Sequence, residues 1–435
     1  MPCAFVFRRD LRLDDNTCLL RALQECDEVV PVFVLDPRQL GDNPYKSAFA
    51  LGFMVDSLLD LDMQLKHRSS RLHILQGYPE KVLPELKVEA IYFNEDYTPF
   101  SLNRDNAIRE TMRGRVKSCE DLLLTPKDFF VRKGKPYTVF THFYNDARKL
   151  EVRKPMKNDM RNYLTLDLPG TEVLKLEVER GIPGGRQEGL KRLERARNLN
   201  YSMRNFPGVE GTTKLSPYIK FGVVSPREVY WAVNEEIRRQ LYWRDFYTLL
   251  AYYNPHVFGH SYKREYDCIP WKWNEAHLEA WKQGKTGYPI VDAGMRELNE
   301  TGFMHNRTRM ITASFLVKVL HVDWRIGERY FATKLVDYDP SVNNGNWQWV
   351  ASTGADYMFR VFNPWLQQRK FDPDAVYIKT WVPELKDLPA EKIHEIYRFK
   401  VSGYPSPIVD YSEEVKKARK MYEDSVALCS KRGLF

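Results

Sequence analysis

Four side chains between positions 240 and 247 combine chemical types that are unusual in a hydrophobic core. The segment has a helical pattern, so Gln240, Trp243, Arg244 and Tyr247 fall at i, i+3, i+4 and i+7 on one helix face. An amide, an indole, a guanidinium and a phenol together suit a cavity that stacks planar rings and holds anionic groups. A polar network between helices accounts for the same spacing equally well.

A second polar helical segment follows at positions 304–310. It places Asn306, Arg309 and Met310 on one face and turns Arg307 away from that face. A third segment, 337–349, begins with carboxylates and ends with two indoles. Trp347 and Trp349 would point roughly 200° apart in a helix, so that one can line a pocket while the other is buried.

Two further features of the sequence have simpler explanations than ligand binding. Asn343 and Asn344 can cap a helix. The sequence Gly284-Lys285-Thr286 has the ending of a phosphate-binding loop, but position 279 holds Glu where that loop needs its first Gly, and no strand precedes it. We therefore exclude a phosphate-binding loop here.

The first 120 residues predict the elements of an α/β domain. Short apolar runs alternate with amphipathic stretches such as Ser47–Lys66 and Leu102–Met112. This alternation is typical of a parallel sheet, which binds ligands at the carboxyl ends of its strands. The predicted strands are Cys3–Phe7, Val29–Leu35, Leu72–Leu75, Ala90–Phe93 and Val116–Cys119. No G-x-G-x-x-G follows any of them, so the usual Rossmann dinucleotide site is not expected.

The remaining chain differs in composition. Pro and Gly punctuate the segment up to about residue 188, and a helical pattern dominates after it. We expect an α/β domain at 1–125, a connector at 126–188 and an all-α domain at 189–435. All ten tryptophans lie between Trp231 and Trp381, which indicates either a large aromatic core or a special aromatic environment.

Composition limits the classes of protein. The chain has 435 residues, is 43% hydrophobic and has no apolar run near the ~20 residues of a membrane span. The N-terminal apolar run predicts a buried strand rather than a signal peptide. Six scattered cysteines cannot form a secreted disulfide scaffold, and with nine scattered histidines they predict no dedicated metal site.

The net charge of +8 is unevenly distributed. Residues 1–120 have 16 Lys and Arg against 19 Asp and Glu, a charge of −3, so the rest of the chain carries +11. A basic surface of this kind suits a polyanionic partner, but the charge alone favours an ordinary solvated surface.

Taken together, the ordered segments resemble the DNA photolyase/cryptochrome family, and class I cyclobutane pyrimidine dimer photolyases in particular. The resemblance begins at Phe7–Arg12, continues through Gly211–Pro217 and is densest from Tyr242 to Asp372. The tract Asn94–Phe100 is most similar to archaeal members. The resemblance implies an N-terminal α/β domain, a helical domain that binds FAD, and repair of UV-damaged DNA. Light-excited reduced FAD would pass an electron to a pyrimidine dimer flipped out of the duplex.

The resemblance also assigns roles around the flavin. Residues 212–216 match the segment that holds the FAD phosphates, and Asn343 matches the residue facing flavin N5. Arg309 and Asp337 would form a buried ion pair beside the ring. The full set of implied FAD-binding residues is Tyr201, Thr212, Thr213, Lys214, Leu215, Ser216, Gln240, Arg244, Asn306, Arg309, Asp337, Tyr338, Asp339 and Asn343.

Further matches concern electron transfer and DNA. Trp347, Trp324 and Trp271 match the chain of indoles that reduces the photoexcited flavin. The implied dimer pocket consists of Gln240, Trp243, Asn306, Met310 and Trp349, and the implied phosphate contacts are Arg307 and Arg360. The related (6-4) photolyases have His at the positions of Asn306 and Met310, so these two residues favour the cyclobutane lesion.

One residue departs from the pattern. Gln240 stands where these photolyases usually have Glu, which hydrogen-bonds the thymine and can supply a proton. Gln keeps a donor and an acceptor but cannot titrate. The substitution bears on repair efficiency rather than on the class of lesion, because the other pocket residues agree with one another.

The resemblance further implies a light-harvesting chromophore, which in this family is FMN, a deazaflavin, a folate or absent. Polar residues near the predicted strand ends could line its pocket: Arg9, Asp10, Asp36, Asn94, Glu95 and Asp96. We expect a cytoplasmic monomer, associated with a prokaryotic nucleoid, with no membrane and no obligate protein partner. The alternatives are a cryptochrome-like photoreceptor without repair, whose usual C-terminal extension is not seen before Phe435, and an electron-transfer flavoprotein without DNA.

Overall fold

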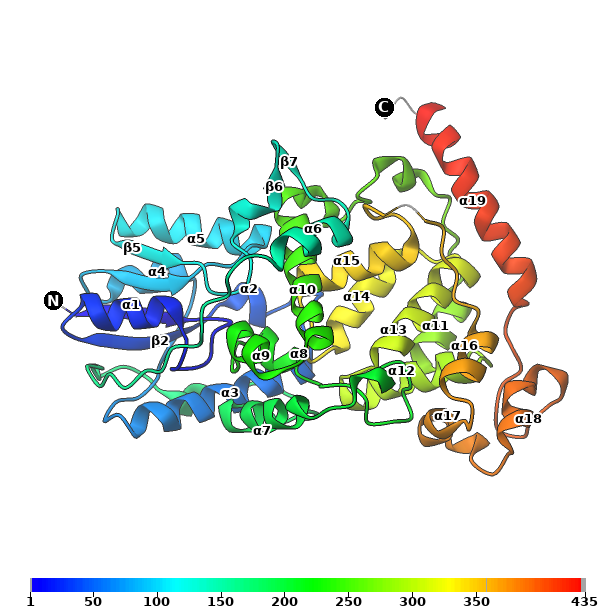
Figure 1. Cartoon of the computed structure of the whole chain (residues 1–435), viewed down its shortest axis with the longest axis horizontal. Coiled ribbons are helices and arrows are strands. Elements are labelled where there is room, and N and C mark those ends of the chain that lie inside the picture. The colour runs from blue at the N-terminus through cyan, green and yellow to red at the C-terminus, as the bar shows by residue number, and fades with distance from the viewer. Residues whose placement is uncertain (1, 357, 432–435) are drawn as a thin grey trace. The chain divides into compact units, whose positions relative to one another are not determined.

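The computed structural model describes residues 2–356 and 358–431, which divide into two compact units (Figure 1). The first unit comprises 1–199, 213–255 and 336–339, and the second comprises 200–212, 256–335 and 340–435. The first contains the strands β1 (Cys3–Phe7), β2 (Val29–Leu35), β3 (His73–Gln76), β4 (Ile91–Asn94), β5 (Val116–Cys119), β6 (Val131–Arg132) and β7 (Lys135–Pro136). The five strands expected from the apolar runs are therefore present, each within one residue of its predicted bounds.

β1 to β5 form one parallel sheet in the order β3-β2-β1-β4-β5. In register, Cys3 lies opposite Val29 and Ala4 opposite Ile91, which places β1 between β2 and β4. β1 and β2, at the middle of the sheet, are apolar throughout because both of their faces are covered. β2 and β3 are added on one side of β1, and β4 and β5 on the other. Where the strand order changes direction in this way, here between β1 and β4, parallel sheets have a crevice at the carboxyl ends of their strands.

Ten helices of the described chain accompany the sheet in the first unit. They are α1 (Thr17–Glu25), α2 (Pro37–Leu40), α3 (Ala48–Lys66), α4 (Pro79–Val82), α5 (Pro99–Met112), α6 (Phe140–Ala147), α7 (Arg186–Arg197), α8 (Ser216–Lys220), α9 (Pro226–Ala232) and α10 (Glu235–Tyr253). Ala4 and Val6 pack with Ile108 and Met112 of α5. Alternate residues of a strand face opposite ways. Cys3, which is bonded to Cys26 just after α1, therefore places α1 on the other face.

The second unit is helical and contains α11 (Glu275–Gln283), α12 (Pro289–Thr301), α13 (Asn306–Ser314), α14 (Trp324–Lys334), α15 (Pro340–Ala351), α16 (Pro364–Phe371), α17 (Val376–Trp381), α18 (Ala390–His394) and α19 (Tyr411–Lys431). A π-helical turn, Phe315–Val319, directly follows α13. The predicted fold class, a parallel α/β domain followed by a helical region, is confirmed.

The two units do not divide the chain at residues 125 and 188. Segment 126–188 and helices α7 to α10 belong to the unit that contains the sheet. This connector pairs with the start of β2 through a β-bridge between Val29 and Tyr163. Helix α9 is held by ion pairs from Arg227 to Asp15, in the loop after β1, and to Asp121, after β5. These ion pairs join residues far apart in the chain, which hydrophobic periodicity does not report.

Two further features concern the loops and the cysteines. Asp292 accepts hydrogen bonds from the backbone N–H groups of Thr286 and Gly287, which makes the Gly284–Gly287 segment a turn built on a carboxylate. Cys268 and Cys429 form a disulfide, as do Cys3 and Cys26, pairings that the sequence did not reveal. Among the described residues, no helix combines the length and apolarity that a membrane span requires.

Candidate functional site

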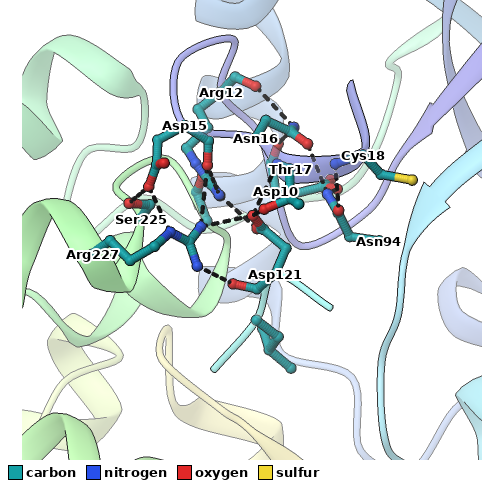
Figure 2. Close-up of polar contacts among 12 residues, drawn as sticks. Asp10, Arg12, Asp15, Asn16, Thr17, Cys18, Asn94, Asp121, Ser225 and Arg227 are labelled. Carbon is teal, nitrogen blue, oxygen red and sulfur yellow. Dashed lines mark hydrogen bonds and ion pairs between the residues drawn. The ribbon is translucent and has the colours of Figure 1, made fainter. Parts of the chain in front are cut away.

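The loop after β1 is fixed by a buried network of charges, shown in Figure 2. Arg12 donates to Asp121 at 2.6 Å, and Arg227 donates to Asp15 at 2.8 Å and to Asp121 at 2.7 Å. Ser225 adds a further hydrogen bond to Asp15. Two arginines and two aspartates balance one another, so the cost of burying each charge is offset by a partner. The network therefore holds residues 8–15 rigidly at the carboxyl end of β1.

This rigid loop directs Arg9 toward two carboxylates. Arg9 Nη1 lies 3.2 Å from Asp96, and Nη2 donates to Asp339. Arg9 Nε also donates to the carbonyl of Lys220. Burial alone would lower the pKa of Arg9, but Asp339 and Asp96 outweigh it and raise that pKa above its ordinary value. Arg9, expected beside an antenna chromophore, thus contacts a residue expected beside FAD.

The other residues expected at the antenna also have partners in the chain. Asp10 accepts from the side chain of Asn94, whose Oδ1 accepts from the backbone of Cys18 (Figure 2). Glu95 accepts from Lys127 at 2.7 Å. Asp36, which caps α2, binds the guanidinium of Arg38. Their role at an antenna stays a prediction.

Beside Asp36, Arg38 forms a cluster with two aromatic rings. Its guanidinium lies 5.0 Å from the ring of Tyr78 and 5.4 Å from that of Phe100. Glu80 holds it from the far side with two hydrogen bonds of 3.0 Å. These residues follow β2, β3 and β4, so they lie at the carboxyl edge of the sheet, where such folds bind ligands.

The segment expected to hold the FAD phosphates leads into α8. Thr213 Oγ1 accepts from the backbone of Leu215, and Lys214 has a left-handed backbone with φ of 50°. Ser216, at the start of α8, donates to Asp337 at 2.6 Å. Nearby, Tyr338 stacks on Tyr45 with ring centroids 6.5 Å apart. The structure therefore brings 213–216 and the 337–339 carboxylates together within the first unit.

Only part of the predicted face of helix α10 is exposed to solvent. Gln240 is exposed, while Arg244 donates to the carbonyl of Leu122 at 2.6 Å. Burial raises the pKa of the neighbouring Asp245 to about 6, and Arg244 opposes that rise. Asp245 accepts from the backbone of Thr125 at 2.8 Å. The guanidinium of Arg244 is thus held by the backbone carbonyl of Leu122.

Trp243 has a partner that the sequence did not reveal. Phe140 of α6 lies flat against it, with centroids 3.5 Å apart and planes 7° from parallel. The guanidinium of Arg239 lies 5.5 Å from the ring centroid of Phe140. One indole face is thereby occupied, and the plane of the ring is set by α6. Phe140 gave no signal in the sequence because stacking partners come from distant segments.

In the second unit, α13 has the arrangement its spacing predicts. The amide of Asn306 contacts Sδ of Met310 at 3.8 Å, so the two lie side by side on the exposed start of the helix. Arg309 donates to the carbonyl of Met304 at 2.7 Å. Arg307, on another face, donates to Asn205 at 2.8 Å and stacks over Phe371 at 4.2 Å. The predicted pair of Arg309 with Asp337 stays a prediction.

Asn343 on α15 is buried and oriented by α14. Its Nδ2 donates to the backbone carbonyl of Glu328 at 3.0 Å, which leaves the amide oxygen to accept from a ligand N–H. The side chain of Glu328 accepts from Asn344 at 2.9 Å. Burial raises the pKa of Glu328 to about 7, and the hydrogen bond from Asn344 opposes this. The backbone carbonyl of Glu328 therefore holds Asn343, and the side chain of Glu328 holds Asn344.

The three tryptophans expected to carry electrons differ in burial. Trp347 and Trp324 are almost fully buried, and Trp271 is partly exposed. Trp347 packs against Phe331 at 4.8 Å, and Trp271 meets Tyr422 edge-on at 6.0 Å. Two of the indoles are therefore interior and one reaches the surface, and their role in electron transfer stays a prediction. Core packing explains the buried pair equally well.

Gly327 permits the position of Trp347. A Cβ atom at residue 327 would collide with the indole ring of Trp347, so only glycine allows α14 to approach α15 this closely. The buried Trp281 also meets Trp347 edge-on, at 6.4 Å, and donates from Nε1 to Thr312. The sequence singled out neither Gly327 nor Trp281, because the contact exists only once the helices pack.

Trp349 and Arg360 come together in the structure. The guanidinium of Arg360 lies 4.2 Å from the centroid of Trp349, and Asp356 also binds it. Phe362 packs near the same indole at 6.1 Å. Another predicted residue of this unit, Tyr201, lies with its ring centroid 5.0 Å from the guanidinium of Arg204. A predicted lesion wall and a predicted phosphate contact therefore form one surface.

The donor set fits FAD. Hydroxyl and ammonium donors of 213–216 suit a diphosphate, and the carboxylates of Asp337 and Asp339 suit sugar hydroxyls. The amide oxygen of Asn343, oriented by Glu328, suits the N–H of a reduced ring. That these residues hold and orient the cofactor stays a prediction.

Comparison with known proteins identifies the family. Residues 3–159 match the DNA photolyase family, and residues 237–424 match the FAD binding domain of DNA photolyase. A deoxyribodipyrimidine photo-lyase of Alkalihalophilus pseudofirmus is 35% identical, over 96% of this chain and 97% of its own.

Solved structures show the same relationship. An archaeal photolyase from Sulfolobus tokodaii with two FAD molecules is 55% identical, with a TM-score of 0.94 over 98% of this chain and 100% of that one. A cryptochrome of Synechocystis is 29% identical, with a TM-score of 0.87 over 97% and 99%. The chain therefore belongs to the DNA photolyase family and contains that family's FAD-binding domain.

Proposed function

We propose that the protein repairs cyclobutane pyrimidine dimers in UV-damaged DNA, using light and reduced FAD. The observation that carries this proposal is the side-by-side placement of Asn306 and Met310 at the exposed start of α13. An amide and a thioether offer hydrogen bonds and soft apolar contact, but neither can act as an acid at neutral pH. Such a pocket suits a lesion whose opening needs an electron rather than a protonated imidazole.

When bound, reduced FAD would supply under light the electron that opens the cyclobutane ring, and that electron would return to it once the two pyrimidines are restored. Residues 213–216 bind its phosphates, and Asn343 accepts from the ring. Trp243 and Trp349 offer apolar faces to the bases and exclude water from them. Arg307 and Arg360 contact DNA phosphates and fix the position of the flipped nucleotide. Trp271, Trp324 and Trp347 would carry an electron inward from a reductant in solution when the flavin is oxidised.

The test is photorepair with chemically reduced protein under blue light. Two oligonucleotides are used, one with a cyclobutane thymine dimer and one with a (6-4) photoproduct, each with a dark control. Repair of the dimer alone supports the proposal. Repair of neither, by protein that holds FAD and photoreduces it, supports the cryptochrome-like receptor. An electron-transfer flavoprotein would show no salt-dependent affinity for DNA, whereas phosphate contacts give a steep log–log slope.

We also propose a second, light-harvesting chromophore at the carboxyl edge of the sheet. Arg38, Tyr78 and Phe100 there combine a cation with two rings, which suits a planar anionic group. The similar Sulfolobus tokodaii protein holds two FAD molecules, which favours a flavin over a folate or deazaflavin. Chromatography of the denatured protein would show two flavins per chain. Tyr78→Ala with Phe100→Ala would lower that ratio to one and leave dimer repair under intense light intact.

We further propose that the protein works as a monomer in the cytosol, at the nucleoid, without an obligate protein partner. Light scattering after size-exclusion chromatography checks the first point. A mass near 51.3 kDa is expected for a monomer, and twice that mass would contradict it.

A further inference from the structure

Lys318 is a buried lysine that none of the roles above uses. It lies in the π-helical turn after α13 and is fully buried. Its Nζ donates to Ser352 Oγ at 2.8 Å and to the backbone carbonyl of Arg360 at 3.0 Å. Lysine is among the residues least often buried completely. These two contacts therefore indicate the role of its amine.

The surroundings of Lys318 are apolar and cationic. Its Nζ lies 4.0 Å from the ring centroid of Phe359 and 4.6 Å from that of Tyr422. Burial lowers the pKa of Lys318 well below its ordinary value, and Arg360 and Arg419 lower it further. The amine therefore acts as a hydrogen-bond donor to neutral oxygens at little cost in buried charge.

Both contacts of Lys318 converge on the backbone of one residue. Ser352, just after α15, accepts from Lys318 and also from the backbone N–H of Arg360, at 3.1 Å. The backbone N–H of Arg360 is thus held by Ser352 and its backbone C=O by Lys318, and these two side chains are hydrogen-bonded to each other. Ser352 itself has a left-handed backbone with φ of 59°, so it is a tightly defined point in the fold.

Fixing this backbone fixes the guanidinium. Around Arg360, the described residues 352–356 and 358–363 belong to no helix or strand, so they supply no ladder of hydrogen bonds to hold it. Its guanidinium nevertheless lies 4.2 Å over Trp349. Trp349 belongs to α15, the helix that ends at Ala351 beside Ser352. Lys318 and Ser352 therefore join Arg360 to the helix that carries its stacking partner.

We propose that Lys318 is a positioning residue that holds Arg360 against Trp349 and so sets the grip on the DNA phosphate beside the lesion. This inference rests on the proposed function. Removing the amine would leave a buried carbonyl without its donor, a state that proteins avoid by moving the segment. Arg360 would then lose its fixed place over the indole, and DNA would be bound more weakly without any change in the photochemistry.

The experiment compares Lys318→Met, Arg360→Met and the double variant in the full-length, FAD-loaded protein. Dark affinity for the dimer oligonucleotide is measured over a range of salt concentrations. Repair per absorbed photon is measured at saturating DNA. Lys420→Met, an exposed lysine of α19, is the matched control.

Lys318→Met is expected to weaken dark binding about tenfold and to lower the salt slope by about 0.9, the share of one phosphate contact. Arg360→Met should do the same, and the double variant should bind no more weakly than Arg360→Met alone. In Lys318→Met, repair per absorbed photon at saturation should stay within twofold. Wild-type affinity in Lys318→Met, multiplied effects in the double variant, or a loss of repair yield at saturation in Lys318→Met would each overturn the proposal.

A second variant covers poor folding of Lys318→Met. Ser352→Ala removes the hydroxyl that both Lys318 and the N–H of Arg360 use, and should weaken binding in the same direction, with the same loss of salt slope. Unchanged binding in Ser352→Ala would overturn the proposal. Failure of wild-type protein to bind or repair the dimer would instead refute the proposed function.

Discussion

Arg9 and Asp339 are ion-paired, although one follows the first strand and the other precedes α15. The same guanidinium also reaches Asp96, after β4. Arg9 thus ties the carboxyl edge of the sheet to the 337–339 segment that we assign to FAD. The charge of Arg9 is well compensated only while both carboxylates are present.

Asp339→Asn should therefore destabilise the protein. Removing one partner of a buried pair costs about 3 kcal/mol, because the remaining charge loses compensation. The free energy of unfolding in urea should fall by about that amount, and purified protein should hold less FAD. Glu85→Gln, at an exposed carboxylate of the same unit, is the control. Unchanged stability and flavin content would show that the pair is dispensable.

Gln240→Glu should raise the quantum yield of repair. The side chain of Gln240 is exposed at the start of the α10 face, and a carboxyl there can supply a proton or a charge that an amide cannot. The yield per absorbed photon is measured at saturating dimer DNA, with Gln187→Glu on α7 as control. A yield equal to or below that of the parent would refute this role.

Trp347→Phe and Trp271→Phe should each slow photoreduction of oxidised flavin at least tenfold. Phenylalanine fills much of the space of an indole but is far harder to oxidise. Repair by chemically reduced protein should not change. Trp273→Phe is the matched control, because Trp273 is 66% exposed and has no assigned role. Normal photoreduction in Trp347→Phe would assign that indole to the core alone.

Glu328 predicts a pH dependence of stability. Its pKa of about 7 lies above the ordinary value of 4.5, so the folded protein binds a proton that the unfolded chain releases between these two values. The contribution of Glu328 to stability should therefore decline as pH rises from about 4.5 to 7, and then stay constant. Glu328→Gln removes this dependence and keeps an acceptor for Asn344.

The measurement is the free energy of unfolding of both proteins at pH 5 and pH 8. The advantage of Glu328→Gln over the parent should grow by at most about 3 kcal/mol between them. Glu423→Gln, at an exposed carboxylate of α19, should show no such trend. A constant difference between Glu328→Gln and the parent would mean that Glu328 ionises normally.

Cys119 should be the first free cysteine to be alkylated. A hydrogen bond from Cys18 lowers the pKa of Cys119, and Arg21 lowers it further, whereas the pKa of Cys18 is raised. More thiolate is then present at Cys119 at pH 7, and the thiolate is the reactive form. Peptide mass mapping after brief treatment with iodoacetamide identifies the site. Arg21→Gln should slow the reaction, and prior labelling of Cys18 would contradict the assignment.

Several elements could be predicted from the residues alone. β1 and β2 match their predicted bounds because an unbroken apolar run needs no knowledge of its neighbours to be recognised as a buried strand. The pairing of Asn306 with Met310 follows from helical spacing, which is a local property. The spacing of residues 284–286 likewise excluded a phosphate loop, and the structure shows a turn held by Asp292.

Other relationships depended on the tertiary structure. Phe140 on Trp243, Lys318 on Arg360 and Arg9 on Asp339 each join segments far apart in the chain. Periodicity reports which side of an element is buried, but it does not report which distant residue will cover it. The amino-acid sequence by itself thus determined the elements, the family and the types of side chain at the site. Only packing decided how those side chains are held, because a contact between distant residues exists only when the chain has closed around it.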